Sequence, residues 1–195
     1  MPRPARFDSE AILAAALRVV GAYGPRRVTV EAVAAEMGGH VGSLYYRFPT
    51  KDHLFAQLWM RCAGDGQAGL LAALDQDDLD RALDRAVLHY PRWSRTEIAA
   101  AQVLAHGREQ LVPNWPDDLA DQLATVNDDL IRAVADFTRR WFGDARAEHR
   151  RAMSLALLDL PSSAIRRYLV VGKPPPVGLD RSILAGARAI LAAAA

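Results

Sequence analysis

The chain has 195 residues, of which 51% are hydrophobic and 24% are charged, and its net charge is +1. This composition is typical of a soluble globular protein with one or two domains, and it excludes a chain that is a polycation as a whole. Residues 1–60 carry seven Arg or Lys against five Asp or Glu, whereas the remainder carries 17 against 18. The small N-terminal excess permits DNA binding without proving it.

Cys62 is the only cysteine, so no disulfide can form within the chain, and a reducing cytoplasm is expected. We expect a buried, inert thiol, although a thiol sensor is conceivable. No apolar run reaches the roughly 18 residues that a membrane span needs, and no signal-peptide pattern follows the N-terminus. The sequence therefore predicts a cytoplasmic protein that does not enter a membrane.

Helical spacing begins close to the N-terminus. Asp8 is placed to cap a first helix, which Gly24 and Pro25 end. Thr29 is placed to cap a second, shorter helix. Glu31 falls in the first turn of that helix, where a carboxylate complements the helix dipole.

A glycine turn at 38–39 separates this second helix from a third over 41–47. Pro49 ends the third helix, and Thr50 caps a fourth that begins at Lys51. Two short helices across a glycine turn are the pattern of the helix-turn-helix unit, whose second helix fits the DNA major groove. The sequence therefore favours a gene regulator over an enzyme.

Longer amphipathic segments follow, and no strand alternation or internal repeat is present. Helices are expected over 51–74, 78–90, 96–111, 117–142, 144–161 with a resumption after Pro161, and 179–194. A stiff linker is expected at 173–176. The predicted fold class is all-α, with a three-helix DNA-binding domain over 1–52 and a larger helical domain over 53–195.

The third predicted helix carries the side chains that DNA reading requires. Gly42 and Ser43 are small where a backbone would approach the duplex, and Tyr45, Tyr46 and Arg47 offer hydrogen-bond donors to base edges or phosphates. An alternative is that the two tyrosines are ordinary half-buried aromatics of a helical hairpin. The combination with the glycine turn favours DNA binding.

Residues around this helix have supporting roles. Lys51 sits at a helix N-terminus, where free amides and a cation together can grip a phosphate, and Thr29 is placed similarly. The apolar residues that would dock the short helix on its neighbours are Val41, Leu44 and Phe48.

The segment 12–54 resembles the N-terminal domain of the TetR family of bacterial repressors. The most specific match is the run 42–51, Gly-Ser-Leu-Tyr-Tyr-Arg-Phe-Pro-Thr-Lys, against the family pattern Gly-Thr-Leu-Tyr-x-x-Phe-x-x-Lys. Further matching pieces are the Ile-Leu-Ala-Ala-Ala-Leu run at 12–17, Tyr23-Gly24, Thr29-Val30 and Ala34. The rest of the chain resembles the family only in its helices and its length.

The resemblance implies a dimeric repressor that places the third helix in the major groove of a palindromic operator. Thr29, Tyr45 and Lys51 would hold phosphates, and Tyr46 and Arg47 would contact backbone or bases. The residues implied to face the bases are Val41, Gly42 and Ser43.

The chain departs from the family pattern at two positions. Gly39 stands where an aliphatic residue is usual, which loosens the turn because glycine loses more backbone entropy on folding. His40 stands where a Ser or Thr cap is usual, and it could still cap weakly or donate to DNA. Arg3 and Arg6 fit a basic arm in the minor groove or, equally, a solubilising tail.

The resemblance also implies a small-molecule inducer pocket and a dimer interface in the C-terminal half. Aromatic and polar residues suited to a pocket are Trp59, Tyr90, Trp93, His106 and Trp115. Apolar residues that could pair across a two-fold axis are Leu155, Leu158, Ile165, Leu169, Ile183 and Ile190. The alternative for both sets is plain core packing within one subunit.

Residues 64–69, Gly-Asp-Gly-Gln-Ala-Gly, match the dinucleotide pattern Gly-x-Gly-x-x-Gly. That motif requires a preceding strand, whereas residues 54–63 have helical spacing. A small-molecule- or nucleotide-binding helical protein that uses these glycines remains the alternative function. No metal-ligand spacing of histidines and no catalytic motif is present, so we expect no metal, no cofactor and no enzymatic activity.

Overall fold

The computed structural model describes residues 8–195, and this part of the chain consists of helices and contains no strand, which confirms the all-α prediction. It divides into two compact units. The first unit holds the described residues up to Ala63 together with Ala99–Ala124, and the second holds Gly64–Ile98 with Thr125–Ala195. The predicted boundary between residues 52 and 53 separates a DNA-binding part from a part that binds a ligand and a second subunit, and it stays a prediction. The predicted basic arm of Arg3 and Arg6 lies outside the described residues.

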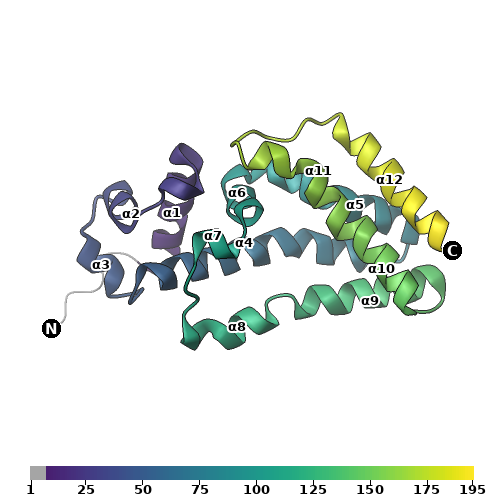
Figure 1. Cartoon of the computed structure of the whole chain (residues 1–195), viewed down its shortest axis with the longest axis horizontal. Coiled ribbons are helices and arrows are strands. Elements are labelled where there is room, and N and C mark those ends of the chain that lie inside the picture. Colours follow the sequence, from purple (N-terminus) through teal and green to yellow (C-terminus); the bar gives the residue numbers. More distant parts are fainter. Residues whose placement is uncertain (1–7) are drawn as a thin grey trace. The chain divides into compact units, whose positions relative to one another are not determined.

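Short helices make up the first unit (Figure 1). They are α1 (Ser9–Tyr23), η1 (Pro25–Arg27), α2 (Val30–Glu36), α3 (Val41–Tyr45), the first half of α4 (Lys51–Leu74), and most of α6 (Ile98–His106), α7 (Arg108–Leu111), η2 (Asp117–Leu119) and α8 (Ala120–Thr125). Three predicted N-caps are in place, and at the third the Thr50 hydroxyl accepts a hydrogen bond from the His53 amide at 3.2 Å. The Asp8 carboxylate accepts a hydrogen bond from the Ala11 amide at 2.7 Å, and the Thr29 hydroxyl accepts one from the Ala32 amide at 3.1 Å.

Apolar side chains hold α1, α2 and α3 against one another. The buried set in this part includes Ile12, Val20, Val33, Leu44, Phe48 and Leu54. The turn between α2 and α3 places Gly38 at a φ of 61°, a left-handed conformation that glycine adopts without steric penalty. The neighbouring Gly39 keeps a negative φ and donates its amide to the Ala34 carbonyl at 2.9 Å. The turn is therefore hydrogen-bonded, and only its first glycine is required by conformation.

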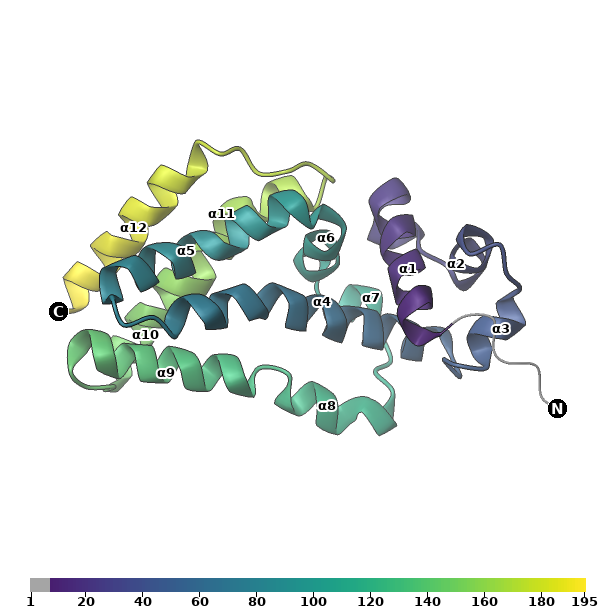
Figure 2. The same ribbon diagram turned by 180° about the vertical axis from the view of Figure 1, so that it is seen from behind.

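Longer helices make up the second unit (Figure 2). They are the second half of α4, α5 (Leu79–Thr96), α9 (Asp128–Phe142), α10 (Ala147–Ser154), the π-helical turn η3 (Leu155–Asp159), α11 (Leu160–Leu169) and α12 (Leu179–Ala194). α5 packs against α11 and α12, and α10 packs against α9 and α12. The core formed there includes Leu83, Val87, Phe137, Met153, Leu157 and Leu191.

Several predicted helix boundaries were wrong, and the helix predicted over 78–90 continues through Pro91 to Thr96 as α5. The segment 96–111 is interrupted at Gly107, which has a φ of 78°, and the segment 117–142 is interrupted at residues 126–127. Conversely, Pro161 does not end a helix, because the π-helical turn η3 leads without a break into α11, which contains Pro161 near its start. Beside it, the Ser162 hydroxyl donates to the Leu158 carbonyl at 2.5 Å.

The predicted dimer residues separate into two groups by burial. Ile165 and Leu169 are fully buried within the second unit, and Ile183 is 3% exposed, so these three offer no surface to a second copy. The interface prediction is wrong for them, because their helical stripe faces the core of their own subunit. Leu155 is exposed, and Leu158 and Ile190 are half-buried.

The glycines of 64–69 lie within the continuous helix α4 and form no phosphate-binding loop. The His89 side chain of α5 lies directly on this stretch, and its Nε2 donates to the Gly66 carbonyl at 2.8 Å. A Cβ at Gly69 would lie 2.3 Å from Cε1 of the same ring. Glycine at 69 therefore makes room for a histidine that ties α5 to α4.

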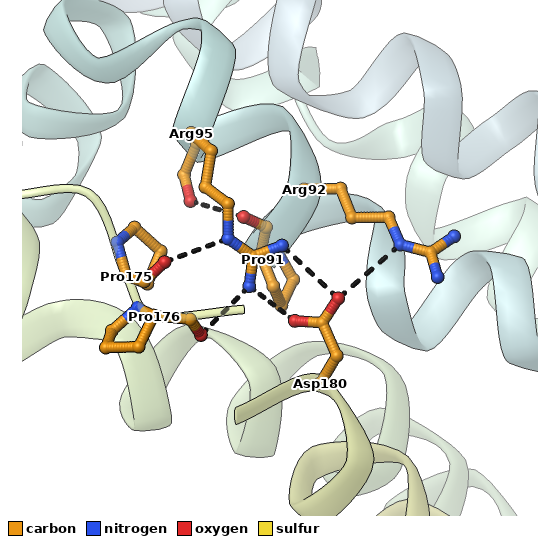
Figure 3. Close-up of polar contacts among 7 residues, drawn as sticks. Pro91, Arg92, Arg95, Pro175, Pro176 and Asp180 are labelled. Atoms are coloured by element: carbon orange, nitrogen blue, oxygen red, sulfur yellow. Dashed lines mark hydrogen bonds and ion pairs between the residues drawn. The ribbon is translucent and has the colours of Figure 1, made fainter. Parts of the chain in front are cut away.

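The linker before α12 is held by Arg95 of α5 (Figure 3). The Arg95 Nε donates to the Pro175 carbonyl at 2.9 Å, and its Nη2 donates to the Pro176 carbonyl at 3.2 Å. The same guanidinium forms a bidentate ion pair with Asp180 in the first turn of α12. One side chain thus fixes both the stiff linker and the start of the last helix.

Candidate nucleic-acid interface

Burial divides α3 and its flanks into an inner and an outer side. Leu44 and Phe48 are 1% and 2% exposed, which anchors the short helix as predicted. Gly42, Ser43 and Arg47 are exposed, and Val41 is half-buried. His40 takes the N-cap position without a side-chain cap hydrogen bond, so its exposed imidazole makes no contact that stabilises the helix start.

The two tyrosines differ in exposure. Tyr45 is 43% exposed and Tyr46 is 79% exposed. Tyr46 is thus no half-buried aromatic of a helical hairpin. The Arg47 guanidinium lies 5.9 Å from the centroid of its ring, within the range of a cation–π contact. The pair presents a flat aromatic ring, a hydroxyl and a positive charge on one exposed surface.

Gly42 lies in open surroundings. A Cβ built there would meet no atom within 4 Å, and the residue does not have a positive φ. Neither packing nor backbone conformation within the chain therefore requires glycine at this position. A close-fitting external partner would account for it.

Lys51 begins α4 and is exposed. Its ammonium lies 5.4 Å from the centroid of the Phe55 ring. No carboxylate lies within 4 Å of that ammonium among residues 8–195, so its positive charge remains available to a phosphate.

A carboxylate shares this surface. The Glu31 carboxylate interacts with the Thr29 hydroxyl and the Lys51 ammonium. The hydrogen bond from its own backbone amide holds the pKa of Glu31 below the ordinary 4.5, and Thr29 and then Lys51 lower that pKa further. Glu31 is therefore ionised at neutral pH.

Two functional candidates were missed by the sequence reasoning. Arg26 and Arg27 form the exposed η1 turn directly before Thr29. Unlike Arg18, which pairs with Glu36 at 2.7 Å, neither has a carboxylate partner within the described part of the chain. The signal was present in the sequence as two adjacent arginines ahead of a helix cap.

A comparison with known families decides the class of this domain. Residues 12–58 match the model of bacterial regulatory proteins of the tetR family. This match assigns the domain at residues 12–58 to the TetR family. No curated protein matches the chain closely enough to add a more specific relative.

Solved structures agree with the TetR fold over nearly the whole chain. A TetR transcription regulator from Haloarcula marismortui has a TM-score of 0.70 at 15% identity, covering 96% of this chain and 95% of its own. The fatty acid degradation regulator FadR from Bacillus halodurans has a TM-score of 0.68 at 14% identity, covering 92% and 97%. A transcriptional regulator from Rhodococcus sp. Rha1 has a TM-score of 0.67 at 20% identity, covering 96% and 97%. At these identities the likeness concerns the fold.

The predicted pocket residues fall into two sets. In the first unit the Trp59 and Trp115 rings meet edge to face at 6.0 Å, and His106 bonds through Nδ1 to the Gln102 carbonyl at 2.9 Å. In the second unit Tyr90 and Trp93 stack at 5.6 Å.

Two of these residues line hollows. Trp115 lines one of about 510 Å³ with Arg108, Val112 and Leu123. Trp93 lines another of about 540 Å³ with Arg85, His89 and Arg92. The indole Nε1 of Trp59 is buried and has no hydrogen-bond partner in the described structure.

No group of His, Cys, Asp and Glu side chains within residues 8–195 is arranged to hold a metal ion. None of the helices in that range is long and apolar enough to cross a membrane. Cys62 is fully buried, as expected for an inert thiol.

Proposed function

We propose that this TetR-family protein is a homodimeric transcriptional repressor that binds a palindromic DNA operator and is released by a small-molecule inducer. The observation that carries the proposal is the outer side of α3 and of the turn that follows it. There Tyr46 and Arg47 are exposed and Gly42 has no structural need to be glycine. These features match what a helix needs in order to enter the major groove.

The division of labour follows the sequence prediction. Residues 1–52 bind DNA, and residues 53–195 bind the inducer and the second subunit. The DNA contacts come from Thr29, His40, Val41, Gly42, Ser43, Tyr45, Tyr46, Arg47 and Lys51, to which we add Arg26 and Arg27. The protein acts in the cytoplasm and catalyses no reaction.

Dimerisation is part of the proposal because one short recognition helix contacts only a few base pairs, whereas a two-fold dimer reads two half-sites. The remaining surface candidates are Leu155, Leu158 and Ile190. They lie on η3 and α12, which pack against each other, so an isologous interface could use both elements.

Enrichment of random duplexes by the purified protein, followed by sequencing, tests the proposal. We expect a two-fold symmetric motif that the Tyr46→Ala variant fails to enrich. Tyr46 is largely exposed, so its loss leaves the fold intact. Enrichment of no sequence at low salt would sink the repressor proposal.

Salt dependence tests the phosphate contacts separately. Lys51→Ala should weaken binding to all duplexes alike. It should also make the slope of log K against log salt shallower by about one unit for each subunit bound. An unchanged slope would remove Lys51 from the contact surface.

A further inference from the structure

A chain of hydrogen bonds ends beside Lys51. The Thr50 hydroxyl and the His53 Nδ1 are 2.8 Å apart, and the His53 backbone amide donates to the same Thr50 oxygen at 3.2 Å. On the far side of the imidazole, Nε2 lies 2.9 Å from Oδ1 of Asp118. Asp118, His53 and Thr50 thus form a continuous relay.

The relay joins segments that are far apart in the sequence. Thr50 directly precedes α4 and His53 lies in its first turn, whereas Asp118 lies 65 residues after His53, in η2. The His53 side chain is 17% exposed and is held at both ring nitrogens, while the Asp118 side chain is 68% exposed. A second contact joins the same parts of the first unit, because Trp59 of α4 meets Trp115, which lies just before η2.

The position of the relay gives it a mechanical role. The first amides of α4 have no partners within the helix, and the Thr50 hydroxyl satisfies that of His53. Asp118 fixes the ring, the ring orients the Thr50 hydroxyl, and that hydroxyl defines how the chain enters α4. Lys51 is the first residue of α4, so the geometry of this entry decides where its ammonium points.

We propose that His53 and Asp118 are positioning residues for the phosphate contact of Lys51. Through this relay, η2 holds the first turn of α4 in the orientation that binds DNA. The inference rests on the proposed function for the role of Lys51, and it extends that function to residues that touch no DNA. The relay also connects η2 to the residue proposed to contact a DNA phosphate. Asp117, which precedes Asp118 in η2, lines the hollow of about 510 Å³.

Asp118→Ala tests the relay, with Asp117→Ala as its matched control. Both variants remove one negative charge from the same turn, and Asp117 has no hydrogen bond to His53. The charge change alone would tighten DNA binding equally in both. We expect Asp118→Ala instead to weaken binding to a fixed duplex about two- to tenfold relative to Asp117→Ala, the range set by one side-chain hydrogen bond.

A double-variant cycle separates positioning from general destabilisation. In the Lys51→Ala background, Asp118→Ala should weaken binding no further, and its salt slope should match that of Lys51→Ala alone. Asp118→Asn keeps the oxygen that accepts from His53, so it should retain most of the affinity. Thermal unfolding of each variant checks that the folded fraction at the assay temperature is unchanged.

Equal DNA affinities of Asp118→Ala and Asp117→Ala would overturn the relay. It would also be overturned if Asp118→Ala weakened DNA binding as much in the Lys51→Ala background as in the unmodified protein. In both cases intact DNA binding by the unmodified protein would leave the repressor proposal standing. Absence of DNA binding by the unmodified protein at low salt would overturn both proposals together.

Discussion

Among single residues, Glu31 carries a negative charge that would repel the DNA phosphates its neighbours are proposed to hold. It is an ionised, exposed carboxylate that interacts with Thr29 and Lys51, the two groups proposed to hold phosphates at helix starts. The dipole of α2 favours a carboxylate in its first turn. A DNA phosphate, however, must compete with that carboxylate for the lysine. If the first effect dominates, removal of the Glu31 charge weakens DNA binding, and if the second dominates, removal strengthens it.

We expect Glu31→Gln to tighten binding to any duplex about two- to fivefold, the scale of an exposed charge interaction, and to steepen its salt dependence. Glu36→Gln is the control, because it removes the same charge from the same helix at a site paired with Arg18. Fluorescence anisotropy of a labelled duplex measures both. Weaker binding by Glu31→Gln would show that stabilisation of α2 outweighs competition for Lys51.

At the scale of elements, the contact between α4 and α5 depends on the absence of a side chain at residue 69. Gly69→Ala places a Cβ 2.3 Å from the His89 ring, so the ring must leave the Gly66 carbonyl or the helices must separate. We expect the free energy of unfolding to fall by about 1–3 kcal/mol, as for overpacking in a core. Urea denaturation measures this loss.

Gly64→Ala is the matched control in the same helix. No atom lies within 4 Å of a Cβ built there, and alanine in a helix interior is more stable than glycine by up to about 1 kcal/mol. The two substitutions should therefore shift the urea midpoint in opposite directions. A shift of the same sign in both would mean that the His89 ring does not restrict the size of the side chain at residue 69.

The same contact predicts a dependence of stability on pH. Burial holds the pKa of His89 below the ordinary 6.5, against the smaller effect of its bond to Gly66. The unfolded chain therefore binds this proton more readily than the folded chain. The stability that His89 contributes is complete above pH 6.5 and is lost as the pH falls below that value.

His89→Gln should flatten the fall of the unfolding midpoint between about pH 6.5 and pH 5, because glutamine does not titrate. Thermal unfolding at a series of pH values measures this. His106→Gln serves as the comparison, and an equal flattening there would assign the pH dependence to histidines in general.

The predictions from sequence succeeded where structure is local. Asp8 and Thr29 cap their helices, and Leu44 and Phe48 bury as their spacing indicates, because caps and short amphipathic helices depend on residues three or four apart. The break at residues 126–127 and the continuation through Pro161 were not foreseen. The pairing of His53 with Asp118 depends on packing between distant segments, which periodicity does not encode.

At the scale of the whole molecule, the proposed dimer depends on surface that a single chain leaves uncovered. Leu155→Asp should abolish dimerisation and reduce affinity for a palindromic operator, because it buries a charge at the centre of the proposed contact. Ile131→Asp is the control, since Ile131 is 63% exposed on α9 and lies outside the proposed surface.

Light scattering measures the mass of both variants in solution. A dimer that persists in Leu155→Asp would move the interface away from η3. Monomers in both variants would show that apolar surface in general, rather than this patch, holds the subunits together.

The fully buried Cys62 allows local opening of the protein to be measured by chemical labelling. Because it is the only thiol in the sequence, an alkylating reagent can react with the native protein only when the packing around α4 opens. The labelling rate therefore measures how often that part of α4 leaves its closed state, without any engineered probe. A ligand that stiffens this region will slow the modification, whether it is a duplex or a small molecule.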